Sequence, residues 1–248
     1  MKIGVFGNSF AQKNPGTKYP AWFDILGEKL GADSVDGLGD PGVGIFPLYQ
    51  NFIREQANYD LTLFLIPSWD GYPKKVTIRY TSEYGSFIEK ETSLSSLSAV
   101  EDFLNRYNLE PDSRELLEHI RNWFIVNDDD YMLLGRELLL RNIEKNYSNV
   151  VLINCGDTDP IRQKWGSEKR KKQMRVGLGH FWNAQFKSFP ERHRLSERPE
   201  VIQTHFTPET TVLFADAVHQ YITTGEWPAP PEKVDHEFPI EFYYEIRD

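Results

Sequence analysis

The chain has 248 residues, with 28 Lys and Arg against 37 Asp and Glu, so its formal net charge is −9. This acidic balance argues against general binding to nucleic acids or membrane surfaces. Its single cysteine, Cys155, excludes an internal disulfide and ends an apolar run, which indicates a buried structural thiol. No stretch approaches the length of a membrane span and the amino terminus lacks a signal-peptide pattern, so we expect a cytoplasmic protein.

The chain opens on an apolar run, Lys2 to Phe6, which predicts a short buried strand ended by Gly7. A turn, Gly7-Asn8-Ser9, follows it. Apolar spacing then predicts a helix over 19–30, a strand over 33–36, a glycine-rich loop over 37–44, a helix over 46–57 and a strand over 61–66. This alternation predicts an α/β fold, a parallel sheet with helices on both faces in a flavodoxin-like three-layer sandwich.

In such a fold the crossovers are right-handed, so the loops that follow the strands gather along one edge of the sheet. We therefore expect Ser9, the 37–44 loop and the 68–71 loop to meet there. Open α/β sheets bind their ligands at this carboxyl edge. Ser9 is thus the first candidate for chemistry.

The segment from about 72 to 146 interrupts the alternation. The strand predicted over 76–80 could be half of a hairpin through Glu83-Tyr84-Gly85. Helices are predicted over 99–107, 114–126 and 133–145, so the segment is interpreted as a largely helical insertion over or beside the sheet edge. The acidic run 127–130 lacks the glycine-containing loop of a calcium site, so a solvated turn is favoured there and no metal site is expected.

A fourth buried strand is predicted over 149–155, and a last helix over 208–222, capped by Thr207 with Pro208 in its first turn. Residues 1–225 are therefore interpreted as a single domain. The tail, 226–248, is rich in Pro, acidic and aromatic residues and is expected to wrap the surface or contact a partner.

Seven Lys and Arg residues cluster between 162 and 175. A solvated, mobile loop is the favoured interpretation of such a charge block. The alternative is a binding site for an anionic ligand.

Hydrolysis through a serine needs a base for the hydroxyl and N–H donors for the developing oxyanion. Ser9 supplies the hydroxyl, and His205, just before the last predicted helix, is the candidate base. The backbone N–H groups of Ser9 and of a glycine in the 37–44 loop are candidate donors. The structural alternatives are a serine that caps the turn into the first helix and a histidine bonded to backbone at a helix entry.

These residues resemble the SGNH, or GDSL-like, hydrolase family. Gly7-Asn8-Ser9-Phe10 is similar to its Gly-Asp-Ser block, with Asn8 in the place of Asp. Gly39 is similar to its oxyanion glycine and His205 to its final histidine. The resemblance covers the core strands and last helix, and implies an ester hydrolase that uses Ser9 as nucleophile, His205 as base and no cofactor.

Two positions depart from the family pattern. The third block reads Pro67-Ser68-Trp69-Asp70, in which Trp69 stands where the family has an oxyanion asparagine and Asp70 alone matches. Ser68 and Asp70 are the remaining candidates there for oxyanion or substrate binding. Ile202 stands at the place of the family's acid, so the role of orienting His205 would pass to a backbone carbonyl or to Glu200 or Asp157.

The leading hypothesis is a serine esterase acting on a small-molecule or carbohydrate ester, with Trp165, Phe181 and Trp182 as aromatic residues that could face sugar rings. The alternative is a non-catalytic binding or structural protein that retains the fold. A dinucleotide site is weakly supported, because Gly4-x-x-Gly7 is not a Gly-x-Gly-x-x-Gly turn and the glycine-rich loop follows the second strand.

Overall fold

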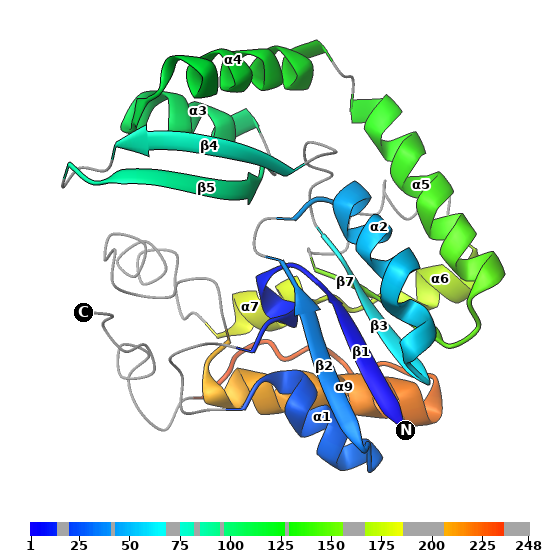
Figure 1. Ribbon diagram of the computed structural model, residues 1–248. Coiled ribbons are helices and arrows are strands. Elements are labelled where there is room, and N and C mark those ends of the chain that lie inside the picture. The colour runs from blue at the N-terminus through cyan, green and yellow to red at the C-terminus, as the bar shows by residue number, and fades with distance from the viewer. Residues whose placement is uncertain are drawn as a thin grey trace.

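The computed structural model describes residues 1–13, 20–40, 43–67, 75–81, 85–94, 97–126, 129–155, 167–185 and 206–235. Within them, four parallel strands form the main sheet in the order β2-β1-β3-β7. Their bounds are β1 (Lys2–Gly7), β2 (Ser34–Gly39), β3 (Leu61–Ile66) and β7 (Val150–Asn154). All four predicted strands are confirmed. Figure 1 shows them side by side with their carboxyl ends at one edge.

Helices cover both faces of this sheet, so the α/β class is confirmed (Figure 1). One layer contains α1 (Trp22–Leu30) and α9 (Pro208–Thr224), which pack on each other and on one face. The other contains α2 (Ile45–Glu55), extended by the 3-10 turn η2 (Gln56–Asn58), and α5 (Asp129–Asn146).

Side chains along each strand point alternately to the two faces of the sheet, so each face has its own hydrophobic core. Ile3 and Val5 of β1 point toward α1 and α9, whereas Phe6 points toward α2 and α5. Each such side chain is fully buried, and burial of one aliphatic or aromatic residue stabilises a fold by about 1.5–3 kcal/mol. The buried runs in β1, β3 and β7 therefore fix the sheet that positions the Ser9 turn.

The helix ends follow local rules. Gly31 ends α1 with a left-handed φ of 63°, a conformation that glycine adopts without strain. Thr207 caps α9 by accepting a hydrogen bond from the Thr210 N–H, and Pro208 lies in the first turn, as predicted.

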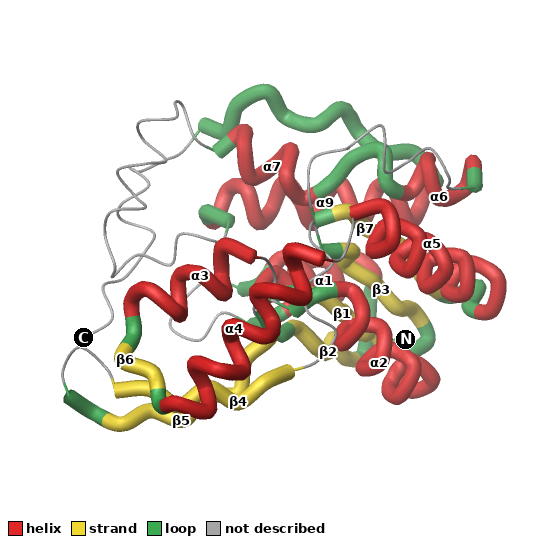
Figure 2. Tube along the Cα trace, turned by 90° about the horizontal axis from the view of Figure 1, so that it is seen from above, coloured by secondary structure: helices red, strands yellow, loops and turns green. Residues whose placement is uncertain are grey.

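A second lobe lies between β3 and α5. It contains a hairpin of β4 (Lys75–Thr81) and β5 (Phe87–Ser93), then α3 (Leu97–Arg106), β6 (Asn108–Leu109) and α4 (Pro111–Val126). The lobe has its own core, which includes Ile78, Val100, Leu117 and Ile120. Figures 1 and 2 place it beyond the edge to which the parallel strands point.

This lobe is of mixed α and β composition, whereas the sequence predicted a largely helical insertion. The hairpin suggested for the strand over 76–80 is present as β4 and β5, and β6 pairs with the other edge of β4, so a three-stranded sheet accompanies the helices. The last predicted helix of the insertion, α5, packs instead on the main sheet through Leu140 and Ile143.

Two short helices, α6 (Glu168–Gln173) and α7 (Leu178–Ala184), follow β7. The first part of the tail packs on them: the Trp227 Nε1–H donates to the Gln173 carbonyl at 2.9 Å, and the Val234 N–H donates to the Ala184 carbonyl at 2.9 Å. Residues 236–248 lie outside the described part of the chain. In that described part, no helix combines the length and apolar character needed to cross a membrane.

Candidate active site

Ser9 lies directly after β1, at the carboxyl edge of the sheet. It is the first residue of a 3-10 turn, η1 (Ser9–Ala11), and is half-buried. The Asn8 Oδ1 atom accepts the Phe10 N–H at 3.1 Å, and the Ser9 carbonyl accepts the Gln12 N–H at 3.2 Å. Asn8 therefore caps this 3-10 turn.

Gly39, at the end of β2, lies against this turn. It pairs with Gly7, and its carbonyl accepts a hydrogen bond of 3.0 Å from the Gln12 side chain. A Cβ atom at position 39 would overlap the Asn8 carbonyl oxygen and lie 2.6 Å from the Ala11 carbonyl carbon. Only glycine allows this close approach of backbone to backbone. The expected meeting of Ser9 with the glycine-rich segment is thus confirmed for Gly39.

The first three residues of the glycine-rich segment are strand, since β2 extends to Gly39 rather than ending at Asp36. Glycine is required at position 37 for the same reason as at position 39, because a Cβ atom there would lie 2.6 Å from the Ala11 carbonyl oxygen. These glycines are packing requirements of the Ser9 turn, not loop residues.

Three of the proposed site residues, His205, Ser68 and Asp70, lie outside the described residues. So do Trp69, Ile202, Glu200 and Asp157. The structure does describe Phe206, which adjoins His205 in the sequence, and Phe10, which adjoins Ser9. Their ring centroids are 5.0 Å apart. Phe206 also packs on Phe214 of α9, at 5.3 Å.

Trp182 of α7 completes this aromatic cluster at 6.3 Å from Phe10. Of the three aromatic residues proposed to face sugar rings, Phe181 is excluded because its side chain is buried in the main core against Phe214. Trp182 is half-buried, and Trp165 lies outside the described residues. The cluster was missed from the sequence, although Phe10 and Phe206 each adjoin a candidate site residue.

His180 is the histidine nearest to this cluster in the described sequence, two residues before Trp182. Its Nδ1 atom accepts the Gly177 N–H at 3.1 Å, at the start of α7. The same Nδ1 atom lies 3.3 Å from the Gly177 carbonyl oxygen, so whether it accepts or donates depends on the tautomer of the ring. This backbone contact holds the His180 ring at the start of α7.

Cys155 directly follows β7, and its side chain contacts Asn8 of the Ser9 turn. Burial raises the pKa of its thiol from 9.0 to about 12, partly offset by the positive charge of Arg136 and by a hydrogen bond with the Asn8 side chain. The expected buried thiol is confirmed.

We expect Cys155 of the folded protein to resist alkylation by iodoacetamide at about pH 8, since the thiolate is the reactive form and the raised pKa removes it. The unfolded chain should be alkylated readily, which intact-mass measurement would detect. Because the folded pKa exceeds the unfolded one, this group's stabilising contribution is full below about pH 9 and is lost toward pH 12, by up to about 1.4 kcal/mol per pH unit. Equal alkylation of folded and unfolded protein would contradict the assignment.

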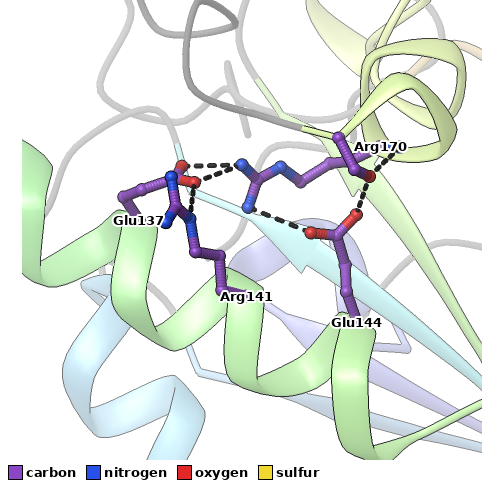
Figure 3. Close-up of polar contacts among 5 residues, drawn as sticks. Glu137, Arg141, Glu144 and Arg170 are labelled. Carbon is purple, nitrogen blue, oxygen red and sulfur yellow. Dashed lines mark hydrogen bonds and ion pairs between the residues drawn. The ribbon is translucent and has the colours of Figure 1, made fainter.

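The basic cluster is ordered by ion pairs where the structure describes it. Arg170 of α6 is 2% exposed, and its Nη2 atom donates to both carboxylate oxygens of Glu137 on α5 at 2.5 and 2.7 Å (Figure 3). Its Nη1 atom lies 3.4 Å from Glu144. The solvated-loop interpretation is therefore wrong for residues 168–173.

Two further cations of α6 also have acidic partners, Glu168 for Lys171 and Glu226 for Lys172. An anionic ligand at 162–175, the alternative interpretation of the cluster, stays a prediction, and these ion pairs would have to open or share their cations to bind it.

Within the described ranges, no group of three or more His, Cys, Asp or Glu side chains is arranged to hold a metal ion. No protein-family model matches the sequence, and no curated protein matches it significantly. Function is therefore inferred from the geometry around Ser9.

Proposed function

We propose that the protein is a serine ester hydrolase of the SGNH type, with Ser9 as nucleophile and His205 as general base. The contact between Phe10 and Phe206, at 5.0 Å, carries this proposal. Because these rings adjoin Ser9 and His205 in the chain, their packing keeps the two backbone segments close together. The strand order β2-β1-β3-β7 supports a flavodoxin-like three-layer sandwich.

In this proposal His205 removes the proton from the Ser9 hydroxyl, whose oxygen attacks the ester carbonyl. The backbone N–H groups of Ser9 and Gly39 stabilise the oxyanion, and collapse of the tetrahedral intermediate releases the alcohol. Water, activated by the same histidine, then hydrolyses the acyl-enzyme. Ser68 and Asp70 are the proposed residues for substrate contact on the β3 side.

The proposed substrate is an acyl or acetyl ester of a carbohydrate. Trp182, half-buried beside Phe10, supports this choice because an aromatic ring packed on the residue that follows Ser9 offers an apolar surface to the C–H face of a sugar. A small-molecule ester would use the same nucleophile.

Replacement of His205 by glutamine should lower kcat for p-nitrophenyl acetate by about 100-fold or more, because it removes the general base. His180→Gln is the matched control and should retain wild-type kcat, since the His180 Nδ1 atom is bonded to the Gly177 N–H. Both are measured by p-nitrophenolate release. Loss of activity in His180→Gln alone would transfer the role of base to His180.

The second candidate is a non-catalytic binding protein with the same fold, favoured by Trp69 and Ile202 at positions where the family has functional residues. It would be supported if wild type and His205→Gln release p-nitrophenolate at the same rate.

A further inference from the structure

The outer edge of β2 presents backbone groups that no other described strand pairs. β1 flanks β2 on its inner side, and β2 is the last described strand on that side of the main sheet (Figure 1). The Asp40 N–H donates to the Gly7 carbonyl at 3.0 Å, so Asp40 faces β1. Because successive residues along a strand face opposite sides, the N–H and C=O groups of Val35, Gly37 and Gly39 face outward.

A groove lies along this outer edge and reaches the Ser9 turn. Its volume is about 620 Å³, and it is lined by β2 from Val35 to Gly39, by Gln12 and Lys13, and by Tyr59. The Gln12 N–H donates to the Ser9 carbonyl at 3.2 Å, so this wall of the groove continues directly into the turn that carries the candidate nucleophile. The Gly39 N–H, the proposed oxyanion donor, faces the same side of β2. An ester bound at Ser9 can therefore extend into the groove.

The groove offers both hydrogen-bond donors and acceptors. The Asp36 carboxylate and the Tyr59 hydroxyl are joined by a hydrogen bond. The Gln12 Nε2 atom donates to the Gly39 carbonyl at 3.0 Å, which uses one of its two hydrogens. The N–H and C=O groups of Gly37 face the groove and have no partner strand in the described part of the chain. A ligand with many hydroxyl groups matches this lining, because each hydroxyl can both donate and accept.

The groove has no excess of either charge. Among the described residues that line it, Lys13 is the cation and Asp36 the carboxylate. Lys13 also forms an ion pair of 3.2 Å with Asp24 of α1. The lining therefore favours an uncharged ligand over an anionic or a cationic one.

An extended peptide matches this edge less well than a sugar chain does. Addition of a strand requires a row of outward backbone groups that are free to pair. The Gly39 carbonyl is already bonded to the Gln12 side chain, so Val35 and Gly37 are the outward residues of β2 that remain. Strands usually have about 3–10 residues, so this stretch is too short to hold one in register.

We propose that this groove binds the sugar chain of an acylated, uncharged oligosaccharide, whose acyl group lies at Ser9 and whose further sugar units lie along β2. The side chains of Gln12, Asp36 and Tyr59 bind sugar hydroxyls, and the Gly37 backbone adds a donor and an acceptor. This inference rests on the ester hydrolysis proposed above. It narrows the substrate from a carbohydrate ester of any size to an ester of an oligosaccharide.

Binding is tested with xylotriose, an uncharged trisaccharide without an ester, so the result does not depend on hydrolysis. Titration of the full chain, followed by nuclear magnetic resonance, should show a saturable shift of the Gly37 amide. Asp36→Asn and Tyr59→Phe should each weaken binding about fivefold, because each removes a hydrogen-bonding group from the groove. Glu55→Gln is the matched control and should keep the wild-type Kd, since Glu55 is exposed near Tyr59 but does not line the groove.

Hydrolysis is tested with mono-acetylated xylotriose and mono-acetylated xylose, by release of acetate. Wild type should have a kcat/KM at least about tenfold higher for the trisaccharide ester, because binding of the remote sugar units lowers the barrier at the ester. Asp36→Asn should reduce this preference to about twofold, because it weakens the hold on the sugar chain.

Equal kcat/KM values for the two esters, or no shift of the Gly37 amide with xylotriose, would overturn the groove and leave Ser9 to be judged by p-nitrophenyl acetate. Tighter binding of trigalacturonate than of xylotriose would overturn it in favour of an anionic ligand. Tighter binding of an extended hexapeptide would overturn it in favour of strand addition. Saturable binding of xylotriose by a protein that hydrolyses none of these esters would support the groove and contradict the proposed hydrolysis alone.

Discussion

Replacing Ser9 by alanine should lower kcat/KM for p-nitrophenyl acetate by about a thousandfold or more. The hydroxyl forms the covalent bond to the acyl group. The Asn8 side-chain oxygen in the same turn does not replace it, because that oxygen accepts the Phe10 N–H as the cap of the turn. The measurement is the initial rate of p-nitrophenolate release, with background hydrolysis subtracted.

Ser148→Ala is the matched control, since Ser148 is an exposed residue of the turn before β7. It should hydrolyse the ester at the wild-type rate. Both variants should unfold at the wild-type urea concentration, because the Ser9 turn is held by Asn8 and the backbone. Equal rates for wild type and Ser9→Ala would rule out Ser9 as the nucleophile.

The largest effect on stability is expected for Glu137→Gln, which should lower the free energy of unfolding by about 3–5 kcal/mol. The substitution removes the carboxylate that accepts both bonds from the Arg170 Nη2 atom, and Arg170 is 2% exposed. The buried Arg170 guanidinium would then lose most of the negative charge that balances it, because Glu144, at 3.4 Å, would be the remaining carboxylate. Urea denaturation followed by circular dichroism gives the value.

Arg141→Gln is the control for this ion pair. Arg141 donates to the same Glu137 carboxylate at 2.7 Å but is 60% exposed, so its loss should cost less than about 1 kcal/mol. The double variant Glu137→Leu with Arg170→Met should be more stable than Glu137→Gln alone, because it removes both buried charges. If Glu137→Gln were as mild as Arg141→Gln, the buried pair would not hold α6 to α5.

The sheet could be predicted from the sequence because its strands are continuous apolar runs. The runs in β1, β3 and β7 are buried on both faces, so a helix-length amphipathic pattern does not compete with them. β2 was predicted too short, since Gly37 and Gly39 read as loop residues. Glycine is needed at these positions because the β2 backbone lies against Asn8 and Ala11, and no local sequence pattern reveals that contact.

Contacts between distant parts of the sequence also determine α6 and the candidate site, and no local pattern predicts them. A run of Lys and Arg indicates a solvated segment, and the buried pair of Arg170 depends on Glu137, thirty-three positions earlier in the chain. The approach of Gly39 to Ser9 follows from parallel topology alone. The packing of Phe10 on Phe206 does not, because it requires α9 to dock beside η1, which only the tertiary structure defines.

The most direct test of Ser9 as a nucleophile is covalent labelling by a fluorophosphonate, which reacts with activated serines. The protein is treated with the probe and digested, and the modified residue is identified by tandem mass spectrometry. The proposed mechanism predicts modification at Ser9, and its loss in Ser9→Ala and His205→Gln. Absence of labelling, or labelling at another serine with Ser9 unmodified, would contradict it.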